Sequence, residues 1–255
     1  MYGKIVVANW KMNPSSPREA KLLSVSTKKV AIKLTKTRTI ICPPAIYLPI
    51  LIPSRPSKKI FWGGQDAYPV AEGPHTGEIS VKMIKNSGAD YCLVGHSERR
   101  RAGDNDKIVR EKVQAAIKAG LKPIICVGEE KRDSHGDYLN FLRGQIGACL
   151  GDLKKSYYSE IMIAYEPVWA VGTEDHVADT PDNFLHNALF IRKVFAGLAG
   201  NELALALPVL YGGSVNVKNA AGILTEGRAD GLLVGRESLV PEHFKQILQI
   251  ADKVK

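Results

Sequence analysis

The chain has 255 residues, of which 45% are hydrophobic and 24% are charged, and its formal net charge is +9. This composition is typical of a folded globular protein and argues against disorder. The four cysteines, Cys42, Cys92, Cys126 and Cys149, are widely spaced with no C-x-x-C pair, so we interpret them as buried reduced thiols. No linker separates two halves, and we therefore expect a single domain over residues 1–255.

Neither a targeting signal nor a membrane segment is apparent. Residues 1–7 lead directly into a strand-like run and lack the charged, apolar and cleavage regions of a secretory signal. The longest apolar stretch, residues 40–53, is too short to cross a bilayer and is interrupted by prolines. We therefore expect a cytoplasmic protein with no membrane partner.

Strand-like apolar runs alternate with helix-like stretches along the chain, which is the pattern of repeated βα units. The first unit combines a strand at residues 4–8 with a helix at 17–33, where Ser16 is the expected N-cap and Pro17 the first helical residue. About eight strands are expected in all, the number that closes a parallel barrel. The other strands are expected at residues 37–42, 59–63, 89–94, 121–127, 160–165, 204–211 and 229–234.

Helical spacing of apolar residues predicts further helices at residues 104–119, 137–150, 181–198 and 241–255. A doubly wound open sheet has the same alternation, but it usually carries a glycine-rich phosphate turn early in the chain. Neither G-x-G-x-x-G nor G-x-x-x-x-G-K-[ST] occurs here. We therefore expect an α/β fold with an eight-stranded parallel (β/α)8 barrel, the TIM barrel.

Polar side chains follow several predicted strands. Asn9 and Lys11 follow the first, His96 the fourth and Glu166 the sixth. Each alone has an ordinary explanation as a packing or surface residue. In a parallel barrel, however, the carboxyl ends of all strands share the face on which active sites lie. Their joint placement therefore favours an active site.

Glycine turns follow the last two predicted strands. Gly212 and Gly213 precede Ser214, and Gly235 precedes Arg236. Such turns form tight bends, and they also allow main-chain N–H groups to approach an anion. The residues alone leave both interpretations open.

Six segments, taken together and in this order, resemble the motifs of the triosephosphate isomerase family. The resemblance implies a homodimeric barrel that interconverts dihydroxyacetone phosphate and glyceraldehyde 3-phosphate without a cofactor or metal ion. The segments are residues 9–13 (NWKMN), 76–80 (TGEIS), 94–100 (VGHSERR), 125–129 (ICVGE), 164–173 (AYEPVWAVGT) and 211–215 (YGGSV).

The resemblance also implies catalytic roles. Glu166 would carry the proton between the two substrate carbons, while His96 and Lys11 would stabilise negative charge on the substrate oxygens and Asn9 would orient the carbonyl. This family is itself the standard example of a Glu base with a neutral His, so the roles come from the family and not from residue spacing. Ser97 lies at a helix start whose dipole would disfavour a charged imidazole.

Further residues have supporting roles by the same resemblance. Glu98 would pair with Lys11, Cys126 would pack near the base, and Thr76 would reach into the partner subunit's site. Residues 167–173 would form a loop that closes over the substrate. Main-chain N–H groups would bind the substrate phosphate at Gly172, Ser214, Gly235 and Arg236.

The chain departs from the family pattern at three places. Residues 174–179 replace a short hinge and are about two residues longer by motif alignment. Arg236 stands where glycine is commoner, and we expect only its main-chain N–H to bind phosphate. Asp104 stands where glutamate is common, which concerns support of the site.

Two other function classes deserve comparison. A different phosphate-binding barrel, such as a lyase or synthase, would need additional substrate contacts that the sequence does not reveal. A nucleic-acid-binding barrel would use basic pairs such as Lys28 with Lys29 and Lys154 with Lys155. No aromatic residues alternate with these pairs, so we expect a solvated surface and no nucleic-acid partner.

Overall fold

The structure is a computed structural model that describes residues 3–55, 57–133, 135–170 and 179–254. Eight parallel strands close into a barrel in which each strand pairs with its neighbours in chain order, and β8 pairs with β1. This closure confirms the barrel and rules out the open sheet. The strands are β1 (Ile5–Asn9), β2 (Arg38–Cys42), β3 (Ile60–Gly64), β4 (Tyr91–Val94), β5 (Lys122–Val127), β6 (Met162–Tyr165), β7 (Val209–Tyr211) and β8 (Gly231–Val234).

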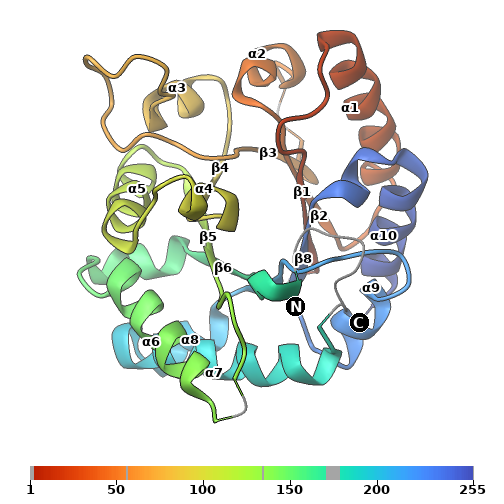
Figure 1. Ribbon diagram of the computed structural model, residues 1–255. Helices are drawn as coiled ribbons and strands as arrows, with labels where there is room; N and C mark the ends of the chain where they lie inside the picture. Colours follow the sequence, from red (N-terminus) through yellow and green to blue (C-terminus); the bar gives the residue numbers. More distant parts are fainter. Residues whose placement is uncertain (1–2, 56, 134, 171–178, 255) are drawn as a thin grey trace.

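Helices surround the strands in a ring (Figure 1). The first helix is capped as expected, since the Ser16 side chain accepts a hydrogen bond from the Glu19 N–H at 3.2 Å. The α-helices are α1 (Pro17–Ala31), α2 (Leu48–Leu51), α3 (Val81–Asn86), α4 (Ser97–Arg101), α5 (Asp106–Lys118), α6 (Asp137–Leu150), α7 (Pro181–Ala199), α8 (Asn201–Ala206), α9 (Ala220–Thr225) and α10 (Pro241–Lys253). The 3-10 helices are η1 (Ala45–Tyr47), η2 (Lys155–Glu160), η3 (Val168–Ala170) and η4 (Arg236–Leu239).

The expected strand at residues 204–211 is wrong in its first half. Residues 201–206 form α8, and only Val209–Tyr211 form β7. Gly200, at φ 94°, separates α7 from α8 with a backbone conformation that other residues rarely adopt. A short apolar run fits a helix as well as a strand, because periodicity cannot distinguish them over so few residues.

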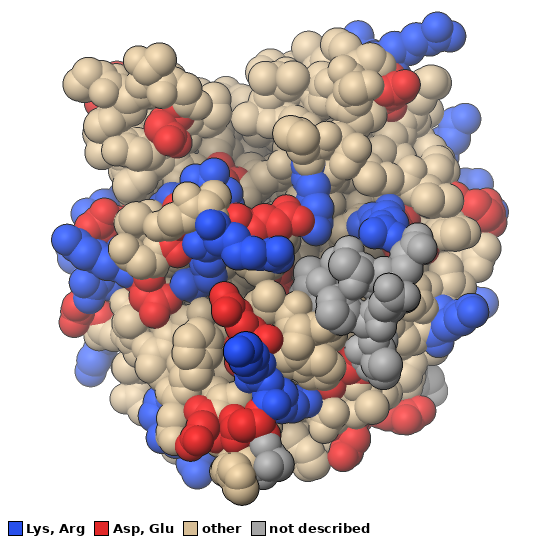
Figure 2. Space-filling model, viewed as in Figure 1, with Lys and Arg blue, Asp and Glu red and all other residues tan. Residues whose placement is uncertain are grey.

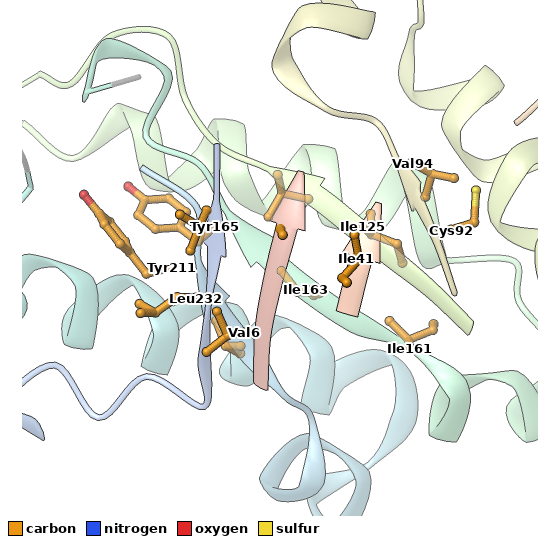
Figure 3. Packing of buried hydrophobic residues seen from close by; sticks show 14 of the residues in the cluster. Val6, Ile41, Cys92, Val94, Ile125, Ile161, Ile163, Tyr165, Tyr211 and Leu232 are labelled. Atoms are coloured by element: carbon orange, nitrogen blue, oxygen red, sulfur yellow. The ribbon is translucent and has the colours of Figure 1, made fainter. Parts of the chain in front are cut away.

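Side chains alternate between the inside of the barrel and the layer beneath the helices. Val6, Ile163 and Tyr165 face the outer layer, where Tyr165 and Tyr211 lie side by side on neighbouring strands (Figure 3). Met162 and Ala164 belong to the inner cluster. Because the period of a strand is two residues, the next inward position after Met162 and Ala164 is Glu166. The same alternation on β1 directs Asn9 inward, so strand geometry itself aims two polar side chains at the barrel mouth.

Candidate active site

The side chains expected to converge at the carboxyl ends of the strands do so. Lys11 Nζ lies 2.7 Å from Glu98 Oε1, and His96 Nε2 lies 3.5 Å from Glu166 Oε1. The Lys11 side chain also runs past Gly235, where an added Cβ would lie 3.4 Å from Lys11 Cε. The ends of β1, β4, β6 and β8 therefore contribute to one site.

Glu166 is a buried carboxylate with one oxygen held and the other unbonded. The residue is 2% exposed. Its Oε2 accepts a hydrogen bond from the Ser97 N–H at 3.2 Å, and Oε1 has no hydrogen-bond partner among the residues that the structure describes. Buried polar atoms are normally satisfied, so an unbonded carboxylate oxygen beside an imidazole is a strong indication of a reactive group.

The imidazole of His96 is oriented by its own helix. His96 is the N-cap of α4, and its Nδ1 accepts a hydrogen bond from the Glu98 N–H at 3.2 Å. A ring nitrogen that accepts from a backbone N–H carries no proton, so the ring proton lies on Nε2. His96 therefore directs its Nε2 toward Glu166, whose Oε1 lies 3.5 Å away.

Lys11 is fixed through its main chain. It has a φ of 53°, an uncommon conformation for a residue other than glycine. Its N–H donates to Asn9 Oδ1 at 3.0 Å, and its carbonyl accepts from Gln65 Nε2 at 2.8 Å. Gln65 also donates to the Cys42 carbonyl at 2.8 Å. Gln65 was missed in the sequence, although it directly follows β3 and the strand-end rule would have found it.

The ammonium of Lys11 has a carboxylate partner, as expected. Partial burial opposes the charge on Glu98, but the hydrogen bond from Lys11 and its positive charge outweigh that effect and lower the pKa of Glu98. The charged Glu98 carboxylate therefore fixes the position of Lys11 Nζ at the barrel mouth.

Cys126 packs near Glu166. It pairs in register with Ala164, two residues before Glu166, and it is 1% exposed. Burial, and next the nearby Glu166 carboxylate, raise the pKa of its thiol well above the ordinary value. A thiol of this kind is a poor nucleophile.

The glycine turns lie beside the same site. The Ser214 hydroxyl donates to the Ala170 carbonyl at 2.6 Å, which links the turn after β7 to η3 after Glu166. Gly235 and the exposed Arg236 begin η4, where the Gly235 carbonyl accepts from the Ser238 N–H at 2.9 Å. Gly172 and residues 174–178 of the altered hinge lie outside the described residues. Asp179, the last residue of that hinge, is described.

Two other predicted positions are Thr76 and Asp104. Thr76 is exposed on the loop between β3 and α3. Asp104 is 8% exposed, and its carboxylate accepts a hydrogen bond from the buried Lys112 ammonium at 2.6 Å. Asp66 completes the ion cluster, since it lies 2.8 Å from Lys112 and 2.9 Å from Arg99. This ion cluster lies at the start of α5, and Lys112 and Asp66 gave no sequence signal.

Neither a metal-binding cluster nor a membrane-spanning helix occurs in the described part of the chain. No cluster of three or more His, Cys, Asp or Glu side chains there has an arrangement that would hold a metal ion. Within the same residues, no helix is long and apolar enough to span a bilayer.

Comparison with known proteins decides the family. The family profile described as triosephosphate isomerase matches residues 4–251. The chain belongs to the triosephosphate isomerase family. It is accordingly an isomerase.

Several curated triosephosphate isomerases are similar to the chain over nearly their whole length. The Natranaerobius thermophilus protein is 36% identical over 249 residues, covering 97% of this chain and 95% of the relative. The Dehalococcoides mccartyi strain BAV1 protein is 39% identical, with 97% and 96% coverage. The Thermus thermophilus protein is 36% identical, with 97% and 98% coverage.

Proposed function

We propose that this protein interconverts dihydroxyacetone phosphate and D-glyceraldehyde 3-phosphate, with Glu166 as the base that carries the proton. The observation that supports this assignment most strongly is the inward-facing Glu166 carboxylate, 2% exposed, with a free oxygen and the His96 N–H beside it. One carboxylate at this position serves both carbons of an enediolate, because it removes the proton from one and returns it to the other.

Charge on the substrate oxygens is stabilised by the groups opposite Glu166. His96 Nε2 donates a hydrogen bond to the oxygen that becomes negative and exchanges protons between the two oxygens. The Lys11 ammonium adds a positive charge, and Asn9 orients the carbonyl. Donors and charges that are already in place need no reorganisation when the oxyanion forms.

The phosphate end of the substrate is assigned to the glycine turns. Main-chain N–H groups at Ser214, Gly235 and Arg236, together with Gly172, bind the phosphate in this proposal. Glycines at such turns allow the main chain to come close to an anion. With phosphate bound there, the carbonyl end of the substrate extends toward Glu166 and His96.

We also propose that the protein acts as a cytoplasmic homodimer of single-domain subunits. Large apolar side chains are exposed after β1, β2 and β3: Met12 is 94%, Ile46 73% and Met83 55% exposed. Few charged side chains cover α2 and α3 in the upper part of Figure 2. Exposed apolar groups of this size favour a protein interface, and Thr76 would reach the partner's site from the neighbouring loop.

An assay coupled to reduction of dihydroxyacetone phosphate tests the proposal. Addition of glyceraldehyde 3-phosphate should give rapid product formation, and a small phosphorylated hydroxamate that resembles the enediolate should inhibit competitively. Absence of turnover, with no binding of the hydroxamate, would instead favour a phosphate-binding barrel that acts on a larger substrate.

A further inference from the structure

Five side chains form a contact cluster behind Glu166 that the proposed mechanism does not use. Glu129 and Arg132 follow β5, Tyr165 ends β6, Trp169 lies in η3, and Asp179 stands just before α7. Tyr165 and Trp169 lie on either side of Glu166 in the sequence. The cluster therefore connects both flanks of the proposed base to the chain after β5 and to the start of α7.

Glu129 holds the two flanks directly. It is 1% exposed. Its carboxylate accepts hydrogen bonds from the Tyr165 hydroxyl at 2.8 and 3.0 Å and from Trp169 Nε1 at 2.9 Å. Its main-chain carbonyl also accepts from the Val168 N–H at 2.9 Å. Three donor groups on the chain around Glu166, from Tyr165, Val168 and Trp169, are thus held by Glu129.

Arg132 is the cation of this cluster. Its guanidinium lies 3.7 Å from Glu129 Oε1 and 3.4 Å from Asp179 Oδ1, and it is 5.3 Å from the centre of the Trp169 ring. The side chain is 21% exposed, so much of it is shielded from water. Arg132 therefore lies between two buried carboxylates, where one guanidinium compensates charges that burial would otherwise make costly.

Asp179 anchors the guanidinium to α7. Its side chain is 0% exposed, and its Oδ1 accepts from the N–H of Thr180, the N-cap of α7, at 3.0 Å. Burial raises its pKa although the Arg132 charge opposes that shift. Asp179 belongs to the stretch in which the chain departs from the family pattern, so this contact is not explained by the family motifs.

We propose that Arg132 and Asp179 are positioning residues for the isomerisation, an inference that rests on the assignment of Glu166 as the base. Asp179 positions the Arg132 guanidinium, which in turn contacts the Glu129 carboxylate and the Trp169 ring. Glu129 then fixes the chain before and after Glu166 through its hydrogen bonds. Rate is sensitive to the placement of a base, and a displacement of about 1 Å costs up to about 100-fold. We therefore expect loss of Arg132 or Asp179 to lower kcat more than it weakens substrate binding.

The first test compares Asp179→Asn and Arg132→Met with the wild-type protein. Asn keeps the shape of Asp and removes its charge. For either variant we expect kcat to fall about tenfold or more, the loss typical of one charge-assisted hydrogen bond, with KM changed less than about threefold. Asp152→Asn is the matched control, since its ion pair with Arg110 is largely exposed. Its kcat should equal that of the wild type.

A double variant separates positioning from mere stability. Arg132→Met with Asp179→Asn removes both charges of this ion pair, so Asp179 is no longer a buried carboxylate that has lost its cation. Thermal stability should therefore recover relative to Arg132→Met. We expect kcat to stay low in the double variant. Arg132→Lys, which keeps the charge, should recover part of the kcat lost in Arg132→Met.

A spectroscopic measurement reports on the cluster directly. With 5-fluorotryptophan in place of Trp10, Trp62 and Trp169, the 19F resonance of Trp169 should shift in Asp179→Asn while the other two stay in place. Wild-type kcat in Asp179→Asn, recovery of kcat in the double variant or an unmoved Trp169 resonance would each overturn the inference. A wild-type protein without isomerase activity would instead overturn the proposed function, and with it the inference.

Discussion

Two glycines at the barrel mouth, Gly128 and Gly212, lie in close contact with Glu166. A Cβ on Gly212 would lie 2.8 Å from Glu166 Cγ, and one on Gly128 would lie 1.7 Å from the Glu166 carbonyl oxygen. The second contact is with main chain, and the first is with the side chain of the proposed base. Gly212 therefore has a packing role toward Glu166 in addition to any role in phosphate binding.

We predict that Gly212→Ala lowers kcat by about 10- to 100-fold, because the new methyl group displaces the Glu166 carboxylate from its bonded position. Steady-state kinetics and thermal unfolding measure the effect. Gly144→Ala is the matched control: nothing lies within 4 Å of its added Cβ, and it stands inside α6, where alanine is favoured. Gly144→Ala should keep full activity, and equal kinetics in both variants would refute this role of Gly212.

At the scale of single residues, strand periodicity makes much of the site predictable. Glu166 and Asn9 continue the inward positions of β6 and β1, and His96 follows β4 directly. The left-handed backbone of Lys11 and its bond to Gln65 were not predictable, because they depend on how β1 and β3 are placed in space. The Lys11 contact with Glu98 came from the family motif.

At the scale of elements, one carboxylate connects the last helix to the start of β2. Asp252, near the end of α10, accepts hydrogen bonds from the N–H groups of Thr35, Lys36 and Thr37 at 2.8 to 3.0 Å. Burial opposes the charge on Asp252, but these main-chain donors outweigh it and hold its pKa well below the ordinary value. The contact thus anchors α10 beside the first βα unit.

Asp252→Asn should destabilise the protein by about 1 kcal/mol at neutral pH, a value reduced for solvent exposure. Folding lowers the pKa of Asp252. The stabilisation is therefore fully present at pH values above the pKa of Asp252 in the unfolded chain, about 3.9, and is lost as the pH falls through the pKa of the folded state. Urea unfolding at pH 7 and at about pH 3 measures the difference. Glu242→Gln on the same helix, in an exposed pair with Lys245, should change little. A pH-independent difference for Asp252→Asn would contradict the linkage.

Most expected strands and helices agree with the structure to within a few residues, but the segment before β7 was assigned wrongly. α6 begins and ends at the expected residues 137 and 150, whereas α8 was taken for part of a strand. The Arg132 contact with Asp179 joins positions 47 residues apart, and only the folded barrel brings them together. No local pattern in the sequence carries that information.

At the scale of the whole molecule, the net charge is +9, and the positive side chains are not gathered into one basic patch on the face shown in Figure 2. Lysine and arginine side chains alternate with aspartate and glutamate across the face in Figure 2. Ion pairs such as Arg99 with Asp66 and Arg100 with Asp106 account for part of this mixing. A mixed surface gives weaker attraction for nucleic acid than a continuous basic stripe.

The homodimer proposal predicts a sedimenting mass twice that of the chain. Ile46→Glu places a charge at a 73% exposed apolar position on the proposed interface, and it should shift the protein toward monomers with reduced kcat. Leu205→Glu is the control, at 82% exposure on α8. It should remain dimeric and active. A wild-type protein that sediments as a monomer would refute the proposal.

The most direct test of the account is the kcat of Glu166→Gln. Glutamine keeps the size of the side chain and its neighbours but cannot accept the substrate proton. We predict that kcat for glyceraldehyde 3-phosphate falls by about 100- to 10,000-fold, the usual contribution of a general base, while the fold and hydroxamate binding persist. A variant that retains near-normal kcat would contradict the assignment of Glu166 as the base.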